Sequence, residues 1–433
     1  MPLLSTRRRC PYCGASIELG ACPVVATSFD GVEFLEDTDV EDIELLSGTL
    51  PLRFLRKTKW PVLAEPPRDR VEEPVASSRQ RSALETALAP RVQVAVTSDA
   101  RLPSLTDEQL AREDVPARAC PDCEFPLPQS IDQRPAVVVA VVGINRVGKT
   151  HLLAASLAQA FRRRGLAPIG CTEFVPDDST SSRFMEDYFI PLFRRGEVLD
   201  ATPPEDVDVR FRPLVFDVTV DGVAFSLVLH DVAGEVLGDH RRRAYVASYL
   251  RAARGMIFVV DPRDVDDLRD GLPDWILDSH ELGGWDQGAL LAACIKPDGV
   301  FADRRAIPIA VTVAKADLLE AAVQEPLPFL QRAPVDEQPE AFVERIRTSS
   351  RQVEAFLERH GAHNILGPSR EYRERLQRTA DGGSASVTFH AVSALGSAPD
   401  MDDQLTEKVQ PINCVDPLAA ILAQIVAADP DPR

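Results

Sequence analysis

Gly143-Ile144-Asn145-Arg146-Val147-Gly148-Lys149-Thr150 follows an unbroken apolar run at 136–142 and leads into a segment with helical periodicity. A glycine-rich turn between a buried strand and a helix is the setting of a phosphate-binding P-loop. Glycines let the backbone N–H groups face a triphosphate, Lys149 places its charge near the outer phosphates, and Thr150 offers a hydroxyl to Mg²⁺. We therefore expect this loop, with His151 after it, to bind a nucleotide, and Lys149 to act in catalysis.

Strand and helix signals alternate from residue 136 onward, which is typical of a parallel-rich sheet covered by helices on both faces. The expected fold class is therefore α/β: a three-layer P-loop NTPase domain whose sheet is mixed but mostly parallel. The dipeptide Asp221-Gly222 predicts a two-residue hairpin turn between antiparallel strands, and the stretch that precedes this hairpin is expected to be irregular. The expected strands are 136–142, 214–220, 223–230, 256–260, 307–313 and 387–392, and the expected helices are 149–164, 240–253, 339–360 and 417–427.

A second motif, Asp231-Val232-Ala233-Gly234, stands directly after an apolar run that is expected to be a strand. A carboxylate in that position can reach Mg²⁺ through water, and the backbone N–H of Gly234 can donate to a γ-phosphate. The motif therefore supports the interpretation of the loop at 143–150.

A third motif, Thr312-Val313-Ala314-Lys315-Ala316-Asp317, follows another buried strand, so Lys315 and Asp317 should emerge where ligands of α/β sheets bind. Asp317 can accept hydrogen bonds from N1–H and the 2-amino group of guanine, a donor pattern that adenine lacks. Ser393 and Ala394 follow the last strand, where a loop can close over the guanine O6. These residues favour GTP over ATP.

Four cysteines form two C-x-x-C pairs, Cys10 with Cys13 and Cys120 with Cys123. Each pair can place two thiolates on one tetrahedral Zn²⁺, so the pairs together predict a Cys₄ site. The long gap between them requires an insertion within the zinc ribbon, and independent or redox-active pairs are the alternative. Cys22 is expected to be a spare, buried thiol.

The expected domains follow from these motifs. Residues 1–28 and 119–134 form the two halves of the zinc ribbon, 29–118 form an acidic insertion and mobile linker, and 135–430 form the nucleotide-binding domain. Insertions are expected near 172–210, 281–305 and 320–385. The segment at 281–305 is a candidate surface for a partner.

Composition excludes some functions. The formal charge of −19 argues against broad attraction to nucleic acid or anionic lipid, so nucleic acid is not an expected partner. No apolar run approaches the roughly 20 residues that span a bilayer, and no apolar stretch follows the basic residues near Met1. We expect a cytoplasmic protein without a membrane span.

In order and spacing the motifs resemble those of the Ras-like, translation-factor class of P-loop GTPases. The paired Cys-Pro-x-Cys knuckles ahead of Asp231-Val232-Ala233-Gly234-Glu235 more narrowly resemble the double-GTPase type of bacterial conflict and signalling systems. The resemblance implies GTP and GDP as ligands, with Thr150 and Asp231 serving Mg²⁺. It also implies a switch threonine that binds Mg²⁺; Thr202 is the first choice, with Thr172 and Thr180 as alternatives.

The chain departs from the family pattern at two positions. Ala314 stands where the family has Asn or Thr, so a side chain that ties the base pocket to the P-loop is missing. Glu235 occupies the place of the glutamine that orients the attacking water, and its charge near the γ-phosphate predicts slow turnover. Three arginines, Arg194, Arg195 and Arg210, are candidates for an internal arginine finger, although each is expected to be a surface charge.

The sequence thus predicts a GTP-binding switch with slow Mg²⁺-dependent hydrolysis to GDP and phosphate, catalysed by Lys149, Glu235 and Thr202. Its zinc ribbon is expected to recruit an unidentified protein partner or activator. The alternatives are an ATP-using P-loop NTPase and a non-hydrolysing nucleotide-binding interaction module. The sequence does not predict the oligomeric state.

Overall fold

The computed structural model describes residues 7–12, 14–27, 62–64, 115–122, 127–163, 165–199, 213–233, 250, 252–272, 286–296, 307–332, 334, 337–378, 386–397, 405 and 408–428. The chain divides into two compact units. One comprises 1–137 with 207–209 and 433, and the other comprises 138–206 and 210–432. Within the described ranges, no helix has the length and apolarity needed to cross a membrane.

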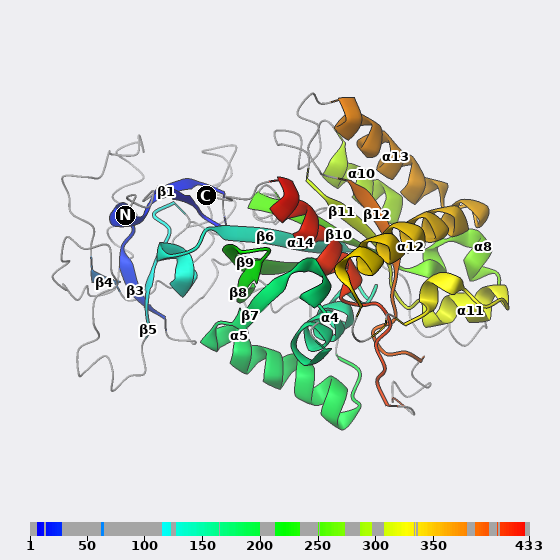
Figure 1. Cartoon of the computed structure of the whole chain (residues 1–433), viewed down its shortest axis with the longest axis horizontal. Helices are drawn as coiled ribbons and strands as arrows, with labels where there is room; N and C mark the ends of the chain where they lie inside the picture. The colour runs from blue at the N-terminus through cyan, green and yellow to red at the C-terminus, as the bar shows by residue number, and fades with distance from the viewer. Residues whose placement is uncertain are drawn as a thin grey trace, which may run out of the picture. The chain divides into compact units, whose positions relative to one another are not determined.

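The larger unit is built on a seven-stranded sheet with strand order β12-β11-β10-β6-β9-β8-β7 (Figure 1). Strands β6, β10, β11 and β12 pair in parallel, whereas β7, β8 and β9 pair antiparallel. The sheet confirms the predicted α/β class with a mixed, mostly parallel sheet. The strands are β6 (Ala136–Gly143), β7 (Cys171–Pro176), β8 (Leu214–Val220), β9 (Val223–Ala233), β10 (Ala253–Val260), β11 (Ile309–Val313) and β12 (Val387–Ala391).

Helices flank this sheet. Helix α14 packs on β10 and β11, and α12 packs on β12. Gly255 in β10 makes the first contact possible, because a Cβ there would stand 2.4 Å from Cγ2 of Ile421. The longer helices are α4 (Lys149–Arg163), α10 (Gln287–Ile295), α11 (Asp317–Val323), α12 (Pro339–Arg359), α13 (His363–Arg378) and α14 (Asp416–Ala428). The helix expected at 240–253 lies almost wholly outside the described residues.

The hairpin between β8 and β9 turns at Asp221 and Gly222, as predicted. Their φ angles are 47° and 80°, which suit a two-residue turn of the primed type. Gly170, just before β7, approaches this turn so closely that a Cβ would stand 1.9 Å from Oδ1 of Asp221. The backbone N–H of Asp221 donates to the carbonyl of Gly170 at 3.1 Å, which fixes the start of β7 against the hairpin.

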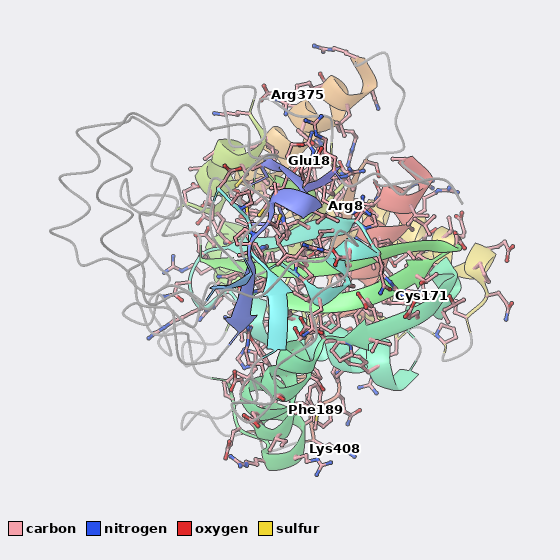
Figure 2. All side chains as sticks on the ribbon, turned by 90° about the vertical axis from the view of Figure 1, so that its left-hand side faces the viewer. Arg8, Glu18, Cys171, Phe189, Arg375 and Lys408 are labelled. Atoms are coloured by element: carbon pink, nitrogen blue, oxygen red, sulfur yellow. The ribbon has the colours of Figure 1, made fainter. Side chains whose placement is uncertain are left out.

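The described part of the stretch before the hairpin, 165–199, is not irregular, and the expectation was wrong for these residues. It contains β7, the short helix α5 (Asp178–Arg183) and η6 (Phe184–Arg195), which is wound as a π-helix. Phe161 of α4 lies 5.2 Å from Phe174 of β7 and 5.6 Å from Phe184, measured between ring centroids. Figure 2 marks Cys171 at the start of β7 and Phe189 on η6. These aromatic contacts hold the segment against the sheet and α4.

In the smaller unit, segments distant in sequence pair with each other. Strand β3 pairs antiparallel with both β4 and β5. Arg118 donates to the carbonyl of Leu19 at 3.1 Å, although the two are 99 positions apart, and to Asp132 at 2.7 Å. The elements are β1 (Arg7–Arg9), β2 (Ser16–Glu18), η1 (Leu19–Ala21), β3 (Val24–Thr27), β4 (Val62–Ala64), β5 (Val115–Arg118) and η4 (Gln129–Asp132).

Candidate functional site

The loop at 143–150 joins the end of β6 to the start of α4. Arg146 and Gly148 have φ angles of 58° and 97°. A Cβ at Gly143 would stand 2.7 Å from the carbonyl oxygen of Val259 in the neighbouring strand β10. Two glycines are therefore needed here for different reasons: Gly143 for a close approach of two strands and Gly148 for its backbone conformation.

Lys149, the first residue of α4, is buried and folds back over the loop. Its Nζ donates to the carbonyl oxygens of Gly143 at 2.9 Å and Ile144 at 2.7 Å. Asn145 accepts a hydrogen bond from the backbone N–H of Arg146, whose side chain is exposed. Val147 is fully buried. The loop thus holds a positive charge at the N-terminal end of a helix, which is an arrangement that suits an anion.

The first and second motifs meet at the start of α4. The hydroxyl of Thr150 donates to Oδ2 of Asp231 at 3.2 Å, although 81 positions separate them. Asp231 lies within β9, which continues to Ala233. Gly234 and Glu235 lie outside the described residues. An aspartate beside a threonine hydroxyl is an oxygen donor set that suits a hard cation such as Mg²⁺.

Two residues that the sequence did not single out, Arg183 and Tyr188, contact each other, and Tyr188 interacts electrostatically with Asp231. The Tyr188 side chain hydrogen-bonds with Arg183, and burial, opposed by Arg183 and reinforced by Asp231, raises the pKa of the Tyr188 phenol. Nε of Arg183 is buried and donates no hydrogen bond. The position of Arg183 and Tyr188 in the sequence could have identified them as candidates, because they lie between the first helix and the hairpin, where a switch residue is expected.

Of the three candidates for an internal arginine finger, two are exposed on the surface and one lies outside the described residues. Arg194 and Arg195 are exposed at the end of η6, and Arg195 forms an ion pair with Glu197 at 3.6 Å. Arg210 lies outside the described residues. The first two therefore agree with the surface-charge interpretation.

The three candidate switch threonines also differ in their surroundings. Thr202 lies outside the described residues, and Thr172 is exposed on β7. Thr180 is 1% exposed, and its hydroxyl accepts a hydrogen bond from the backbone N–H of Val215 at 2.8 Å. Thr180 therefore ties α5 to β8.

Lys315 brings the third motif to the glycine-rich loop. Its Nζ donates to the carbonyl of Arg146 at 3.0 Å and to Oδ2 of Asp261 at 2.8 Å. Asp261 is fully buried and also receives both Nε and Nη2 of Arg263. Sequence reasoning missed Asp261, although it follows an apolar strand directly, as Asp231 and Asp317 also follow apolar runs.

Asp317 and Ser393 are brought together, as the motif analysis expected. Asp317 begins α11 and hydrogen-bonds with the side chain of Ser393, while burial raises the pKa of its carboxyl group. The Ser393 hydroxyl also accepts the backbone N–H of Gly396 at 2.8 Å. Ala394 is half-buried beside them. This corner presents a carboxylate and backbone groups, which is suitable for a ligand that donates several hydrogen bonds.

His151 faces the helix-rich segment after β7. Its Nε2 accepts the backbone N–H of Leu199 at 3.0 Å. Burial, with a contribution from Lys315, lowers the pKa of His151 to about 4. Leu199 packs against Ala154 in a cluster that also includes Leu192. The described contact of the His151 side chain is thus structural.

A second candidate site lies in the smaller unit, where Cys10 and Cys120 are both buried. The backbone N–H of Tyr12 donates to Sγ of Cys10 at 3.4 Å. Cys22 donates its thiol to the carbonyl of Glu18 at 3.4 Å, and burial together with the nearby Cys120 raises its pKa to about 12. Cys22 is buried, as expected.

The other two predicted zinc ligands, Cys13 and Cys123, lie outside the described residues. Among the residues that the structure does describe, no group of three or more His, Cys, Asp or Glu side chains stands together as a metal site. Cys10 and Cys120 are both buried, and Cys120 follows β5, which pairs with β3.

No protein-family model matches the chain. A stretch of 227 residues is 27% identical to SaeC of Mycolicibacterium smegmatis, a protein provisionally described as an ESX-1 scaffolding and assembly protein. The match covers 51% of this chain and 56% of SaeC, so the chain spans little more than half the length of that relative.

Proposed function

We propose that the chain is a GTP-binding switch protein that hydrolyses GTP slowly to GDP and phosphate. The observation that carries this proposal is the meeting of three motifs at the start of α4. The Thr150 hydroxyl contacts Asp231, and Lys315 contacts the carbonyl of Arg146. Three motifs that are far apart in sequence surround one helix N-terminus, as binding of a nucleoside triphosphate requires.

Each group has a role in this proposal. Lys149 neutralises charge on the outer phosphates, and the backbone N–H groups of the loop orient them. Thr150 and Asp231 hold Mg²⁺, which when bound neutralises charge that develops on the phosphate oxygens. Asp317 accepts hydrogen bonds from the base, and Ser393 fixes the orientation of that carboxylate. Catalysis then consists mainly of positioning, with water attacking in line.

The smaller unit is proposed to be a split zinc ribbon that recruits a protein partner. Cys10 and Cys120 are buried, and β5, which ends shortly before Cys120, pairs with β3 in the amino-terminal segment. The description of SaeC as a scaffolding and assembly protein favours a protein partner rather than a nucleic acid. The charge of −19 favours the same choice.

Titration with fluorescent GDP, with Mg²⁺ present, tests the nucleotide proposal. Wild-type protein should bind, Lys149→Ala should bind at least tenfold more weakly, and unlabelled GTP should compete far better than ATP. Arg195→Ala is the matched control, because it removes a surface cation on η6 and should bind as the wild type does. Unchanged affinity in Lys149→Ala would refute the nucleotide site, and equal competition by ATP would replace GTP with a broader nucleotide specificity.

A further inference from the structure

Asp261 is a carboxylate with no contact to solvent, directly after β10. A buried charge is costly unless other charges and hydrogen bonds compensate for it. Arg263 binds it through two nitrogens, with Nε at 3.0 Å from Oδ1 and Nη2 at 2.8 Å from Oδ2. Burial alone would raise the pKa of Asp261, but Lys315 and Arg263 outweigh burial and hold the pKa below its ordinary value. The carboxylate is therefore an anion held between two cations.

One of those cations, Lys315, spans two loops. Its backbone has a left-handed φ of 51°, and the residue that it contacts through a carbonyl, Arg146, has a φ of 58°. The Lys315 side chain also passes close to Gly148, since a Cβ there would lie 4.0 Å from Cε of Lys315. Neither loop has regular secondary structure at this contact. The position of Lys315 therefore depends on what holds its ammonium group.

Asp261 is itself rigidly placed. Its backbone N–H donates to Oε1 of Gln287 at 2.8 Å, and its carbonyl accepts from Nε2 of the same side chain at 3.2 Å. Gln287 lies in the first turn of α10 and also donates to Asp264 at 2.9 Å. Gln287 of α10 thus fixes the backbone of Asp261 where β10 ends.

We propose that Asp261 is the positioning residue that ties the base-binding loop to the glycine-rich loop, in the role that Ala314 cannot fill. This inference rests on the proposed nucleotide function. Ala314 carries only a methyl group and is 4% exposed beneath the loop. Asp261 reaches Lys315 from the neighbouring strand, and Lys315 reaches the carbonyl of Arg146. Because Asp317 is two residues beyond Lys315, the same contact sets the position of the base acceptor.

The test compares Asp261→Asn with Asp266→Asn. Both remove one carboxylate charge, but Asp266 is exposed and has no described contact with Lys315 or Gln287. We expect Asp261→Asn to release GDP at least tenfold faster and to lower the ratio of GDP to ADP affinity at least fivefold. Asp266→Asn should keep both values within about twofold, as surface substitutions do.

A general loss of stability would weaken GDP and ADP binding alike, so the affinity ratio separates positioning from folding. Asp261→Glu retains the charge and serves if Asp261→Asn does not fold; it should give an intermediate fall in the ratio. The inference would be overturned if the wild-type protein binds GDP and a folded variant at Asp261 keeps both the wild-type ratio of GDP to ADP affinity and the wild-type rate of GDP release. Wild-type protein that binds no GDP would instead overturn the proposed function.

Discussion

The ring of His151 in α4 holds the backbone of Leu199, with 3.0 Å between Nε2 and the amide nitrogen. Only a neutral imidazole can accept this bond, because a protonated ring has no acceptor nitrogen. The pKa of His151 is about 4, against an ordinary value of 6.5. At pH values between about 4 and 6.5, His151 is neutral while it holds Leu199 and becomes protonated when the segment around Leu199 opens. Acid should therefore favour opening of this segment.

We therefore expect protection of the Leu199 amide against hydrogen exchange to fall about 30-fold between pH 8 and pH 5, after correction for the intrinsic rate. The sign follows from the lowered pKa: stabilisation is complete above 6.5 and diminishes as the pH falls toward 4. His151→Gln keeps an acceptor oxygen without a titrating ring, so its protection should stay constant over this range. An equal fall in that variant would show that another group titrates.

Gly148 should not tolerate a side chain, even though there is space for one. The nearest side-chain atom to an added Cβ is Cβ of Ala314 at 3.9 Å, which is an ordinary contact. The φ of 97° is the obstacle, and Gly148→Ala should lower the free energy of unfolding by about 1–3 kcal/mol. Gly367 in α13 also has open space but lies within a helix, so Gly367→Ala should add about 0.5–1 kcal/mol. Urea unfolding measures both; equal effects would contradict the assignment of strain to Gly148.

Arg183 should matter for hydrolysis more than the exposed arginines do. It hydrogen-bonds with Tyr188, which lies near Asp231, and its Nε donates to no partner. If the proposed function holds, Arg183→Ala should lower single-turnover GTP hydrolysis by about 10²–10³-fold, as loss of one charge-stabilising donor does, with GDP affinity retained. Arg194→Ala is the control and should hydrolyse at the wild-type rate. Normal hydrolysis by Arg183→Ala would restrict Arg183 to a structural role with Tyr188.

The zinc proposal predicts different effects on metal content for substitutions at two buried cysteines, Cys120 and Cys22. Wild-type protein should contain about one zinc per chain, and Cys120→Ser should lose most of it, because a hydroxyl is a much poorer zinc ligand than a thiolate. Cys22→Ser should keep the metal, since the Cys22 thiol donates to the carbonyl of Glu18. Elemental analysis after dialysis against a weak chelator makes the comparison. Retention of zinc by Cys120→Ser, or its loss from Cys22→Ser, would require a different set of ligands.

Periodicity predicted the regular part of the fold well. The apolar runs at 136–142 and 387–392 became β6 and β12, and the amphipathic stretch at 339–360 became α12. These elements bury one face or both, and burial is what the pattern of apolar residues records. The Asp221-Gly222 turn was also predicted correctly, because its backbone conformation requires residues of this kind.

The secondary structure of the segment from β7 to η6 could not be predicted from apolar periodicity in the same way. Asp178-Ser179-Thr180-Ser181-Ser182 has the composition of a loop, and Pro191 stands inside η6. Contacts between aromatic rings on α4, β7 and η6 stabilise it, and such contacts do not follow from local periodicity. Asp261 was missed for a related reason: its partner Lys315 is 54 positions away.

The place of β6 in the sheet has a consequence for folding. This strand is made before every other strand of its sheet, yet it lies between β9 and β10, and α14 packs on β10 and β11. Contacts between residues so distant along the chain form slowly, because the intervening chain must first be closed into loops. During synthesis the glycine-rich loop therefore leaves the ribosome early, but the strand that supports it gains its neighbours only after residue 260 has been made.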